Sequence, residues 1–215
     1  MDHTSAVDLN HVKKVFREET VLKGITHSFA AGQVHGLVGM NGSGKTVLLK
    51  CICGFLKPTV GEIWVMGKQI GKGVDFPESV GAVIESPGFL PRMSGYQNLR
   101  MLAGIRGKIS EKRIKKTMQR VGLDPDSKKH VEKYSMGMRE RLGIAQAIME
   151  NPRLLILDEP FNGLDKRGVQ EIYDLIWELQ ESGKTIFLVS HNRVDIDTLC
   201  NTVCEMDGGK LSQIR

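Results

Sequence analysis

A glycine-rich segment carries the clearest chemical signal in the chain. It runs Gly39-Met40-Asn41-Gly42-Ser43-Gly44-Lys45-Thr46 and fits the pattern G-x-x-x-x-G-K-[ST]. Glycines let a backbone fold so tightly that successive N–H groups point at phosphate oxygens. In such a loop Lys45 reaches the β- and γ-phosphates, and the Thr46 hydroxyl binds magnesium. The segment therefore predicts a site for a nucleoside triphosphate and Mg²⁺.

A pair of adjacent carboxylates, Asp158 and Glu159, follows four apolar residues at 154–157. A continuous apolar run is typical of a strand that is covered on both faces of a parallel sheet. At the end of such a strand, Asp158 would lie near the magnesium ion held by Thr46, and Glu159 beside the γ-phosphate. One acid for the metal and one for the attacking water is the minimum for metal-assisted phosphoanhydride hydrolysis.

The elements that must position these residues can be read from periodicity and turn residues. A strand is expected before the glycine loop, at residues 34–38, and an apolar helix after it, at 46–55. Further strands are expected at 9–16, 26–29, 61–66, 81–85, 154–157 and 185–189. Further helices are expected at 138–149 and around Val169, Ile172, Ile176 and Leu179, and a hairpin at 203–214. The alternation of strands and helices indicates an α/β protein.

Residues 94–133 differ in character from the rest of the chain. Glycine and strand formers become scarce there, and helical spacing with many lysines and arginines takes over. We expect one domain, in which residues 1–93 and 134–215 form the nucleotide-binding core and 94–133 an inserted helical subdomain. The basic run from Arg106 to Arg120 is interpreted as the solvated face of a helix.

Composition and residue patterns argue against a disordered, a membrane-spanning or a secreted protein. The 215 residues are 40% hydrophobic and 26% charged, which is ordinary for a globular protein, and the formal net charge is only +5. No segment approaches the roughly 18 apolar residues of a membrane span, and residues 1–6 lack a secretory signal. Four cysteines without metal-site spacing predict reduced thiols in the cytosol. Structural or surface roles are expected for His3, His11, His27, His35 and His130.

Three further segments accompany the phosphate loop in a fixed order. They are Tyr134-Ser135-Met136-Gly137-Met138-Arg139-Glu140-Arg141, Asn162-Gly163-Leu164-Asp165 and Ser190-His191. With these segments the sequence resembles, over nearly its whole length, the nucleotide-binding subunits of ATP-binding-cassette (ABC) transporters. In that family they correspond to the signature, the D-loop and the switch histidine. The resemblance implies a P-loop (RecA-like) α/β core with a small antiparallel β subdomain and an inserted helical subdomain.

The resemblance also implies roles for single residues. Glu159 would be the general base for water, assisted by Lys45 and by His191 at the γ-phosphate, and Asp165 would link two sites across a dimer. The signature residues Ser135, Met136 and Gly137 would cap ATP bound to the other subunit. The expected ATP-binding residues are Phe16, Gly39, Asn41, Gly42, Ser43, Gly44, Lys45, Thr46 and Val47. The expected metal ligands are Thr46, Asp158 and Glu85.

Two departures from the family pattern narrow the resemblance. Met136 and Met138 replace residues of the common Leu-Ser-Gly-Gly-Gln signature, and Glu85 stands where the family usually carries glutamine. With both features, the sequence resembles the ATP-binding subunits of exporters of peptide antibiotics and lantibiotics, the bacitracin-transporter-like group. We therefore expect an ATPase that energises export through a permease on a separate chain, paired with a second and identical ATPase subunit. Such a subunit would be cytoplasmic and peripheral at the inner face of the cell membrane.

Two other functions remain open at this point. A soluble ABC ATPase acting on nucleic acid or ribosomes would rest on the basic stretch alone, and no specific nucleic-acid contact is expected. The interval between Thr46 and Tyr134 shows no sustained heptads and leaves no room for the long coiled coil of chromosome-associated members. A small-molecule kinase or a GTPase is the third possibility, but a kinase would not need Ser135, Gly137 or His191. No Asn-Lys-x-Asp motif is present for a GTPase.

Overall fold

The computed structural model describes residues 5–72, 74–85 and 88–215, and the chain forms two sheets with helices on and between them. The smaller sheet is antiparallel, in the order β2-β1-β4-β5. Its strands are β1 (Ser5–Phe16), β2 (Glu19–Ala30), β4 (Val60–Val65) and β5 (Lys68–Gln69).

The larger sheet has six strands in the order β10-β9-β3-β8-β7-β6. Neighbours from β9 to β6 are parallel, and β10 closes the edge as an antiparallel hairpin with β9. The strands are β3 (Val34–Val38), β6 (Val80–Val83), β7 (Leu154–Asp158), β8 (Thr185–Val189), β9 (Thr202–Asp207) and β10 (Lys210–Gln213). This arrangement confirms the predicted α/β class.

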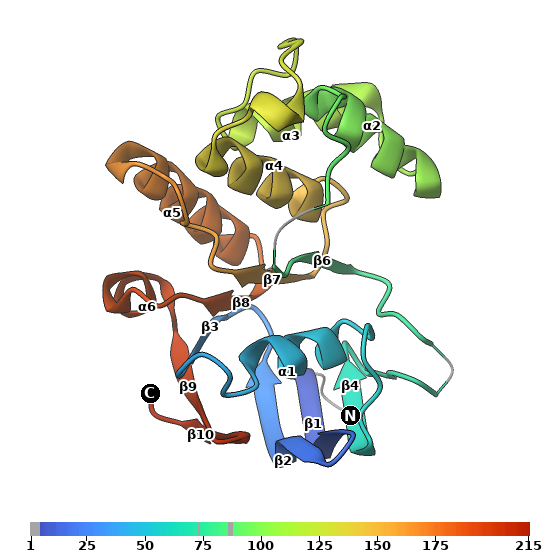
Figure 1. Ribbon diagram of the computed structural model, residues 1–215, viewed down its shortest axis with the longest axis vertical. Coiled ribbons are helices and arrows are strands. Elements are labelled where there is room, and N and C mark those ends of the chain that lie inside the picture. Colours follow the sequence, from blue (N-terminus) through green and yellow to red (C-terminus); the bar gives the residue numbers. More distant parts are fainter. Residues whose placement is uncertain (1–4, 73, 86–87) are drawn as a thin grey trace.

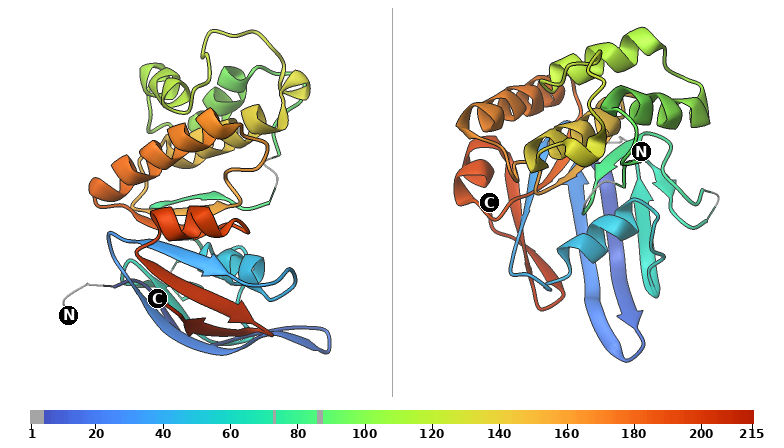
Figure 2. Two further views of the ribbon diagram at one scale, coloured as in Figure 1. Left: turned by 90° about the vertical axis from the view of Figure 1, so that its left-hand side faces the viewer. Right: turned by 45° about the horizontal axis from the view of Figure 1, so that its top comes forward.

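Six α-helices complete the described part of the chain. They are α1 (Lys45–Ile52), α2 (Gly95–Arg106), α3 (Glu111–Arg120), α4 (Met136–Ile148), α5 (Lys166–Glu181) and α6 (Arg193–Leu199). The first lies between the two sheets, and α4 and α5 cover the opposite face of the larger sheet (Figure 1). Figure 2 shows the same layering from two other directions.

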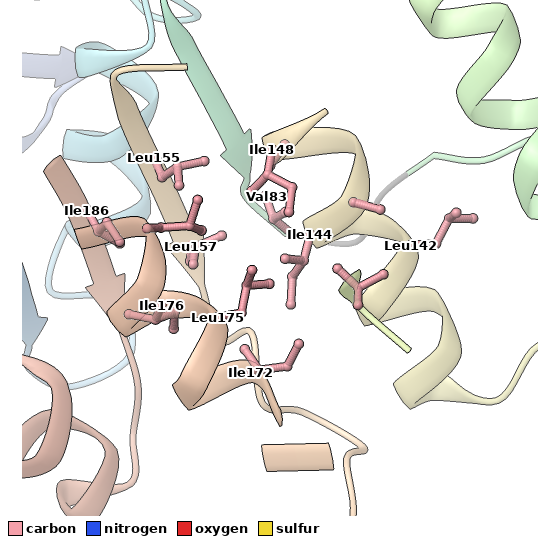
Figure 3. Close-up of a cluster of buried hydrophobic side chains, with 14 of the residues drawn as sticks. Val83, Leu142, Ile144, Ile148, Leu155, Leu157, Ile172, Leu175, Ile176 and Ile186 are labelled. Atoms are coloured by element: carbon pink, nitrogen blue, oxygen red, sulfur yellow. The ribbon is translucent and has the colours of Figure 1, made fainter. Parts of the chain in front are cut away.

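Alternation along the central strands explains this layering. Leu155 and Leu157 of β7 pack with α4 and α5, whereas Leu154 and Ile156 face α1 and the small sheet. The cluster on the helix side includes Val83, Leu142, Ile144, Ile148, Ile172, Leu175, Ile176 and Ile186 (Figure 3). The carboxyl end of β7 is therefore fixed by apolar packing on both faces, and this packing positions Asp158.

Several predicted boundaries are wrong by a few residues. The helix after the phosphate loop ends at Ile52 rather than residue 55, because Gly54 has φ 79° and leaves no room for a Cβ beside the Asp75 carbonyl oxygen, 2.2 Å away. The α4 helix begins at Met136 rather than Met138, because the Ser135 hydroxyl caps it by accepting a hydrogen bond from Met138 N–H, 3.2 Å.

The region from 94 to 133 holds α2, α3 and a short 3-10 turn at Val131–Lys133. Ser94 and Gln97 form a capping box that starts α2. The helical content agrees with the expectation, and the subdomain boundaries stay a prediction.

Candidate functional site

The glycine-rich loop lies between the end of β3 and the start of α1, as predicted. Gly39, Gly42 and Gly44 have φ values of 139°, 78° and 108°, a region that residues with a Cβ rarely adopt. A Cβ on Gly39 would lie 2.2 Å from the Met206 carbonyl oxygen. The loop therefore needs glycine for its conformation and, at Gly39, for close packing against β9.

The amine of Lys45 is held over this loop. Its Nζ donates to the carbonyl oxygens of Gly39, 2.7 Å, and Met40, 3.0 Å. Burial lowers the pKa of Lys45, and the Asp158 and Glu159 carboxylates oppose that shift. The amine thus lies between the loop backbone and two acids, where the oxygens of a bound phosphate would be further acceptors.

Thr46 and Asp158 meet at the carboxyl end of β7. The Thr46 hydroxyl donates to Asp158 Oδ2 at 3.4 Å. Burial raises the pKa of Asp158, and the Thr46 hydrogen bond and the Lys45 charge pull it down. Among the residues that the structure describes, no group of three or more His, Cys, Asp or Glu side chains is arranged to hold a metal ion by itself. A hydroxyl and one carboxylate, completed by phosphate and water oxygens, are the ligand set that suits Mg²⁺.

Glu159 and His191 face each other beside this pair. Glu159 Oε1 lies 3.5 Å from His191 Nε2, and the Glu159 backbone has the uncommon φ of 55°. Burial raises the pKa of the Glu159 carboxyl, and the nearby His191 lowers it. Burial thus makes this carboxylate a stronger base, as activation of water requires.

Two buried side-chain oxygens in the described part of the chain have no hydrogen-bond partner, and both belong to this site. They are Ser43 Oγ in the phosphate loop and Glu159 Oε1. Since buried polar atoms normally find partners, each is suited to a ligand group or a water molecule. The residues present therefore fit a phosphate with its magnesium and an attacking water.

A cavity of about 280 Å³ joins these elements. It is lined by Val21, Asn41, Gly42, Gly44, Lys45, Thr46, Val47, Asp158, Val189 and His191. Most are residues that the sequence singled out. Val21 and Val189 were missed, because an apolar residue on a strand gives no chemical signal.

Five of the predicted ATP-binding, catalytic and metal-binding residues do not line this cavity: Phe16, Gly39, Ser43, Glu85 and Glu159. Phe16, at the end of β1, is 40% exposed, and Lys14 Nζ lies 5.0 Å from its ring centroid. Glu85 forms an ion pair with Lys50 Nζ of α1, 2.7 Å, and has φ 61°. Its charge still raises the pKa of Asp158, which places it near the expected metal position. The roles of Phe16 in binding adenine and of Glu85 as a metal ligand stay predictions.

The signature and D-loop residues lie together, away from the phosphate loop. A cavity of about 680 Å³ is lined by Ser135 and Gly137 of the signature, by Gly163 and Asp165, and by no residue of the phosphate loop. Gly137 and Gly163 pack so tightly that a Cβ on Gly137 would lie 2.5 Å from the Gly163 carbonyl oxygen. Asp165 caps α5 by accepting a hydrogen bond from Gly168 N–H, 2.8 Å, a structural role that the sequence did not reveal.

Other predicted residues behave as structural groups. His35 is buried, with its ring nitrogens 2.7 Å from Thr202 Oγ1 and 2.8 Å from the Ala30 carbonyl oxygen. All four cysteines are free thiols, three of them buried. His11 and His130 are exposed, and His3 lies outside the described residues. Within residues 5–72, 74–85 and 88–215, no helix is both long and apolar enough to cross a lipid bilayer.

Solved structures share this architecture. The chain superposes on an ATP-binding subunit of an ABC transporter with a TM-score of 0.88 at 22% identity, covering 98% of this chain and 90% of the other. It matches the ATP-binding cassette MJ0796, solved as a dimer in a post-hydrolysis state bound to ADP and Pi, with a TM-score of 0.85 at 22% identity and 97% and 99% coverage. It also matches cbiO1 of Clostridium perfringens, part of the transporter complex cbiONQ, with a TM-score of 0.82 at 30% identity. That match covers 98% of this chain and 88% of the other. The fold is thus that of an ABC ATPase.

Sequence relatives point the same way. The chain is 42% identical to the uncharacterized ABC transporter ATP-binding protein YybJ of Bacillus subtilis, over 94% of this chain and 93% of that one. It is 39% identical to the bacitracin transport ATP-binding protein BcrA of Enterococcus faecalis, over 95% of this chain and 67% of that one. The lantibiotic transport ATP-binding protein SrtF of Streptococcus pyogenes is 33% identical over 94% and 87%.

The family model for ABC transporters matches residues 22–162, which run from β2 through the phosphate loop and the signature to the D-loop. The match ends just after the carboxylate pair at the end of β7. Together with the site geometry, it shows that the chain belongs to the ABC transporter family, as an ATP-binding and ATP-hydrolysing subunit.

Proposed function

We propose that this subunit energises the export of a peptide antibiotic, a lantibiotic or a similar amphipathic compound through a separate membrane permease. The convergence of Lys45, Asp158, Glu159 and His191 at the end of the parallel sheet carries the catalytic part of the proposal. The names of the bacitracin and lantibiotic transport relatives support the choice of cargo. We infer a cytoplasmic subunit that is bound peripherally at the inner face of the membrane.

Hydrolysis follows from the arrangement of side chains. Lys45 and the loop N–H groups bind the β- and γ-phosphates, and Thr46 and Asp158 hold the magnesium ion. A magnesium ion held there would neutralise charge that develops on the phosphate oxygens. Glu159 accepts a proton from the water that attacks the γ-phosphorus, and the bond between that phosphorus and the bridging oxygen breaks to release ADP. His191, 3.5 Å from Glu159, helps to hold the carboxylate and the γ-phosphate in place. Phe16 would stack on the adenine ring, and Glu85 would be a third ligand near the metal.

A second copy of the chain completes the site in this proposal. The signature cavity and the phosphate-loop cavity have no lining residue in common, which supports capping of each nucleotide by Ser135 and Gly137 of another subunit. Head-to-tail pairing with two-fold symmetry places the signature of each subunit over the ATP of the other. The Ser135 hydroxyl and the N–H groups at the start of α4 offer donors to the γ-phosphate. Asp165 lies beside the signature, where it can link the two sites.

A groove with large exposed apolar side chains fits the permease. A cavity of about 540 Å³ lies between the end of α1, the segment before and along β6, and the C-terminal halves of α2 and α4. Three large apolar side chains there are strongly exposed: Phe55 at 60%, Phe76 at 58% and Ile105 at 78%. A helix from a membrane protein that packs into this groove would bury them.

The test is to tag the chain in its native cell, solubilise the membranes gently and identify the proteins that copurify. We expect a polytopic membrane protein in stoichiometric amount. Ile105→Asp should abolish its recovery, because a charge would be buried in the groove, while the ATPase activity of the purified chain stays unchanged. Ile214→Asp, which changes an exposed isoleucine of the C-terminal tail, is the matched control. Recovery of ribosomes or nucleic acid, with no membrane protein, would overturn the proposal.

A further inference from the structure

The His191 ring is weakly held by its own contacts. Its side chain is 55% exposed, and Glu159 Oε1 lies 3.5 Å from its Nε2. It lines a cavity of about 630 Å³ together with Glu159, Phe161 and Asn192. Because few side-chain contacts hold the ring, the backbone of residues 190–192 sets the position and direction from which the imidazole extends. The groups that fix residues 190–192 therefore decide where the imidazole lies.

A buried carboxylate fixes this segment. Asp195 of α6 is 2% exposed and accepts hydrogen bonds from Tyr173 Oη, 2.5 Å, Ser190 Oγ, 2.5 Å, and Asn192 Nδ2, 3.1 Å. No lysine, arginine or histidine of the described chain forms an ion pair with it. Ser190 and Asn192 flank His191 on both sides, and Ser190 Oγ also accepts from Asn192 N–H, 3.1 Å. One carboxylate thus holds both neighbours of the histidine.

The same carboxylate is connected to the loop of the general base. Tyr173 lies on α5, next to α6, and its ring packs edge-on against Phe161 with centroids 5.2 Å apart. Phe161 follows Glu159 by two residues, and Glu159 N–H donates to the carbonyl oxygen of Val189, 3.0 Å. Burial and the Asp195 carboxylate raise the pKa of Tyr173, so its hydroxyl remains a donor at any physiological pH.

Capping of α6 does not explain this carboxylate. Asn192 already caps that helix by accepting a hydrogen bond from Val194 N–H, 3.0 Å. Burying a carboxylate without a cation is costly, and three converging donors are needed to offset that cost. Two of these donors, Ser190 and Asn192, flank His191. The third, Tyr173, lies on the helix that packs against the Glu159 loop.

We propose that Asp195, together with Tyr173, is a positioning residue that holds His191 in register with Glu159 and the γ-phosphate. This inference rests on the proposed role of His191 in hydrolysis. Asp195 is buried and does not line the phosphate-loop cavity, so in this proposal it acts only on the geometry of the histidine. A displacement of about 1 Å in a catalytic group is enough to lower turnover on the order of a hundredfold.

The test is steady-state hydrolysis of MgATP by the purified chain, with a double-mutant cycle. Asp195→Asn should lower kcat by about ten- to a hundredfold and leave KM within about twofold, because the phosphate loop is untouched. Tyr173→Phe should have a smaller effect in the same direction. In a His191→Ala background, Asp195→Asn should cause no further loss, since its target is gone. Tyr96→Phe on α2 is the matched control and should behave as wild type.

Each outcome bears on a different claim. If Asp195→Asn lowers kcat by the same factor with and without His191, or leaves kcat unchanged, the positioning role is wrong. If His191→Ala itself retains full turnover, the proposed function of the histidine fails, whatever Asp195 does. Should Asp195→Asn not fold, Tyr173→Phe carries the same cycle with the same two readouts.

Discussion

At the scale of single residues, the side chains around the phosphate loop make a few contacts that a nucleotide can replace. Lys45 Nζ donates to two carbonyl oxygens of the loop, and the Thr46 hydroxyl to Asp158. Charged phosphate oxygens are stronger partners for Lys45 than neutral carbonyl oxygens, and a magnesium ion would be a stronger partner for Thr46 and Asp158 than their mutual hydrogen bond. Together with the buried oxygens of Ser43 and Glu159, the contacts describe a site built for an anion and its metal.

Glu140 gives a prediction about stability that is separate from catalysis. Burial raises the pKa of this carboxyl, on α4 behind the signature, from 4.5 to about 7. Between these values the folded protein binds a proton that the unfolded chain has lost, so stability falls as pH rises through this window and then levels off. Glu140→Gln should therefore raise the free energy of unfolding at pH 8 by about 1 kcal/mol, a figure reduced for partial exposure.

Urea denaturation at two pH values measures this effect. At pH 4 the variant and the wild type should be equally stable, because Glu140 is protonated in both states. An equal gain at both pH values would mean that the amide packs better, and the titration argument would be wrong.

Local spacing made Lys45, Thr46 and Asp158 predictable. The first two lie in one contiguous motif, and the third follows an apolar strand that is visible in the sequence. The ion pair between Lys50 and Glu85 and the cap that Asp165 forms on α5 were not predicted. The former joins two elements that are distant in sequence, and the latter needs a helix boundary that periodicity places only within a few residues.

At the scale of elements, close backbone contacts position the parts that surround the site. Gly81 of β6 packs against the C-terminal end of α4, where a Cβ would lie 1.9 Å from the Ala147 carbonyl oxygen and 3.0 Å from Pro152 Cγ. Strand β6 leads to Glu85 and also lines the groove assigned to the permease. The distance between β6 and α4 therefore affects both regions.

Gly81→Ala should separate these two elements. We expect a loss of about 1–3 kcal/mol in the free energy of unfolding, since neither the α4 backbone nor the proline ring can move aside freely. Gly104→Ala is the matched control, because a Cβ at that exposed position in α2 meets nothing within 4 Å. This control should gain about 0.5–1 kcal/mol from its helix position. Thermal and urea melts measure both, and equal effects would show that the predicted clash is absent.

Strong periodicity decided which elements could be predicted. The buried strands β3, β7 and β8 and the amphipathic helix α5 were recognised because each has a continuous or regularly spaced apolar pattern. The seven-residue helix α6 was missed, since it is short and polar and its main signal is the Asn192 cap. The two-residue strand β5 was missed for the same reason of length.

At the scale of the whole molecule, the fold separates two half-sites. The phosphate loop, Asp158 and His191 line one cavity, and the signature and D-loop line another. The backbone contact between Gly137 and Gly163 makes the signature and D-loop one packed unit. Binding of ATP between the phosphate loop of one subunit and the signature of its partner would thus join the subunits, and hydrolysis would release them.

The central claim is that Glu159 activates the water that hydrolyses ATP held between two subunits. The oligomeric state of the Glu159→Gln variant in MgATP tests this claim most directly. The amide cannot accept a proton from water but fits the same space. Analytical ultracentrifugation should show a stable dimer of this variant. The dimer should retain ATP, and ATPase turnover should be lost. Glu181→Gln, at the exposed end of α5, should hydrolyse ATP like the wild type and return to monomer as ATP is consumed. A Glu159→Gln protein that stays monomeric and hydrolyses ATP at the wild-type rate would contradict the account.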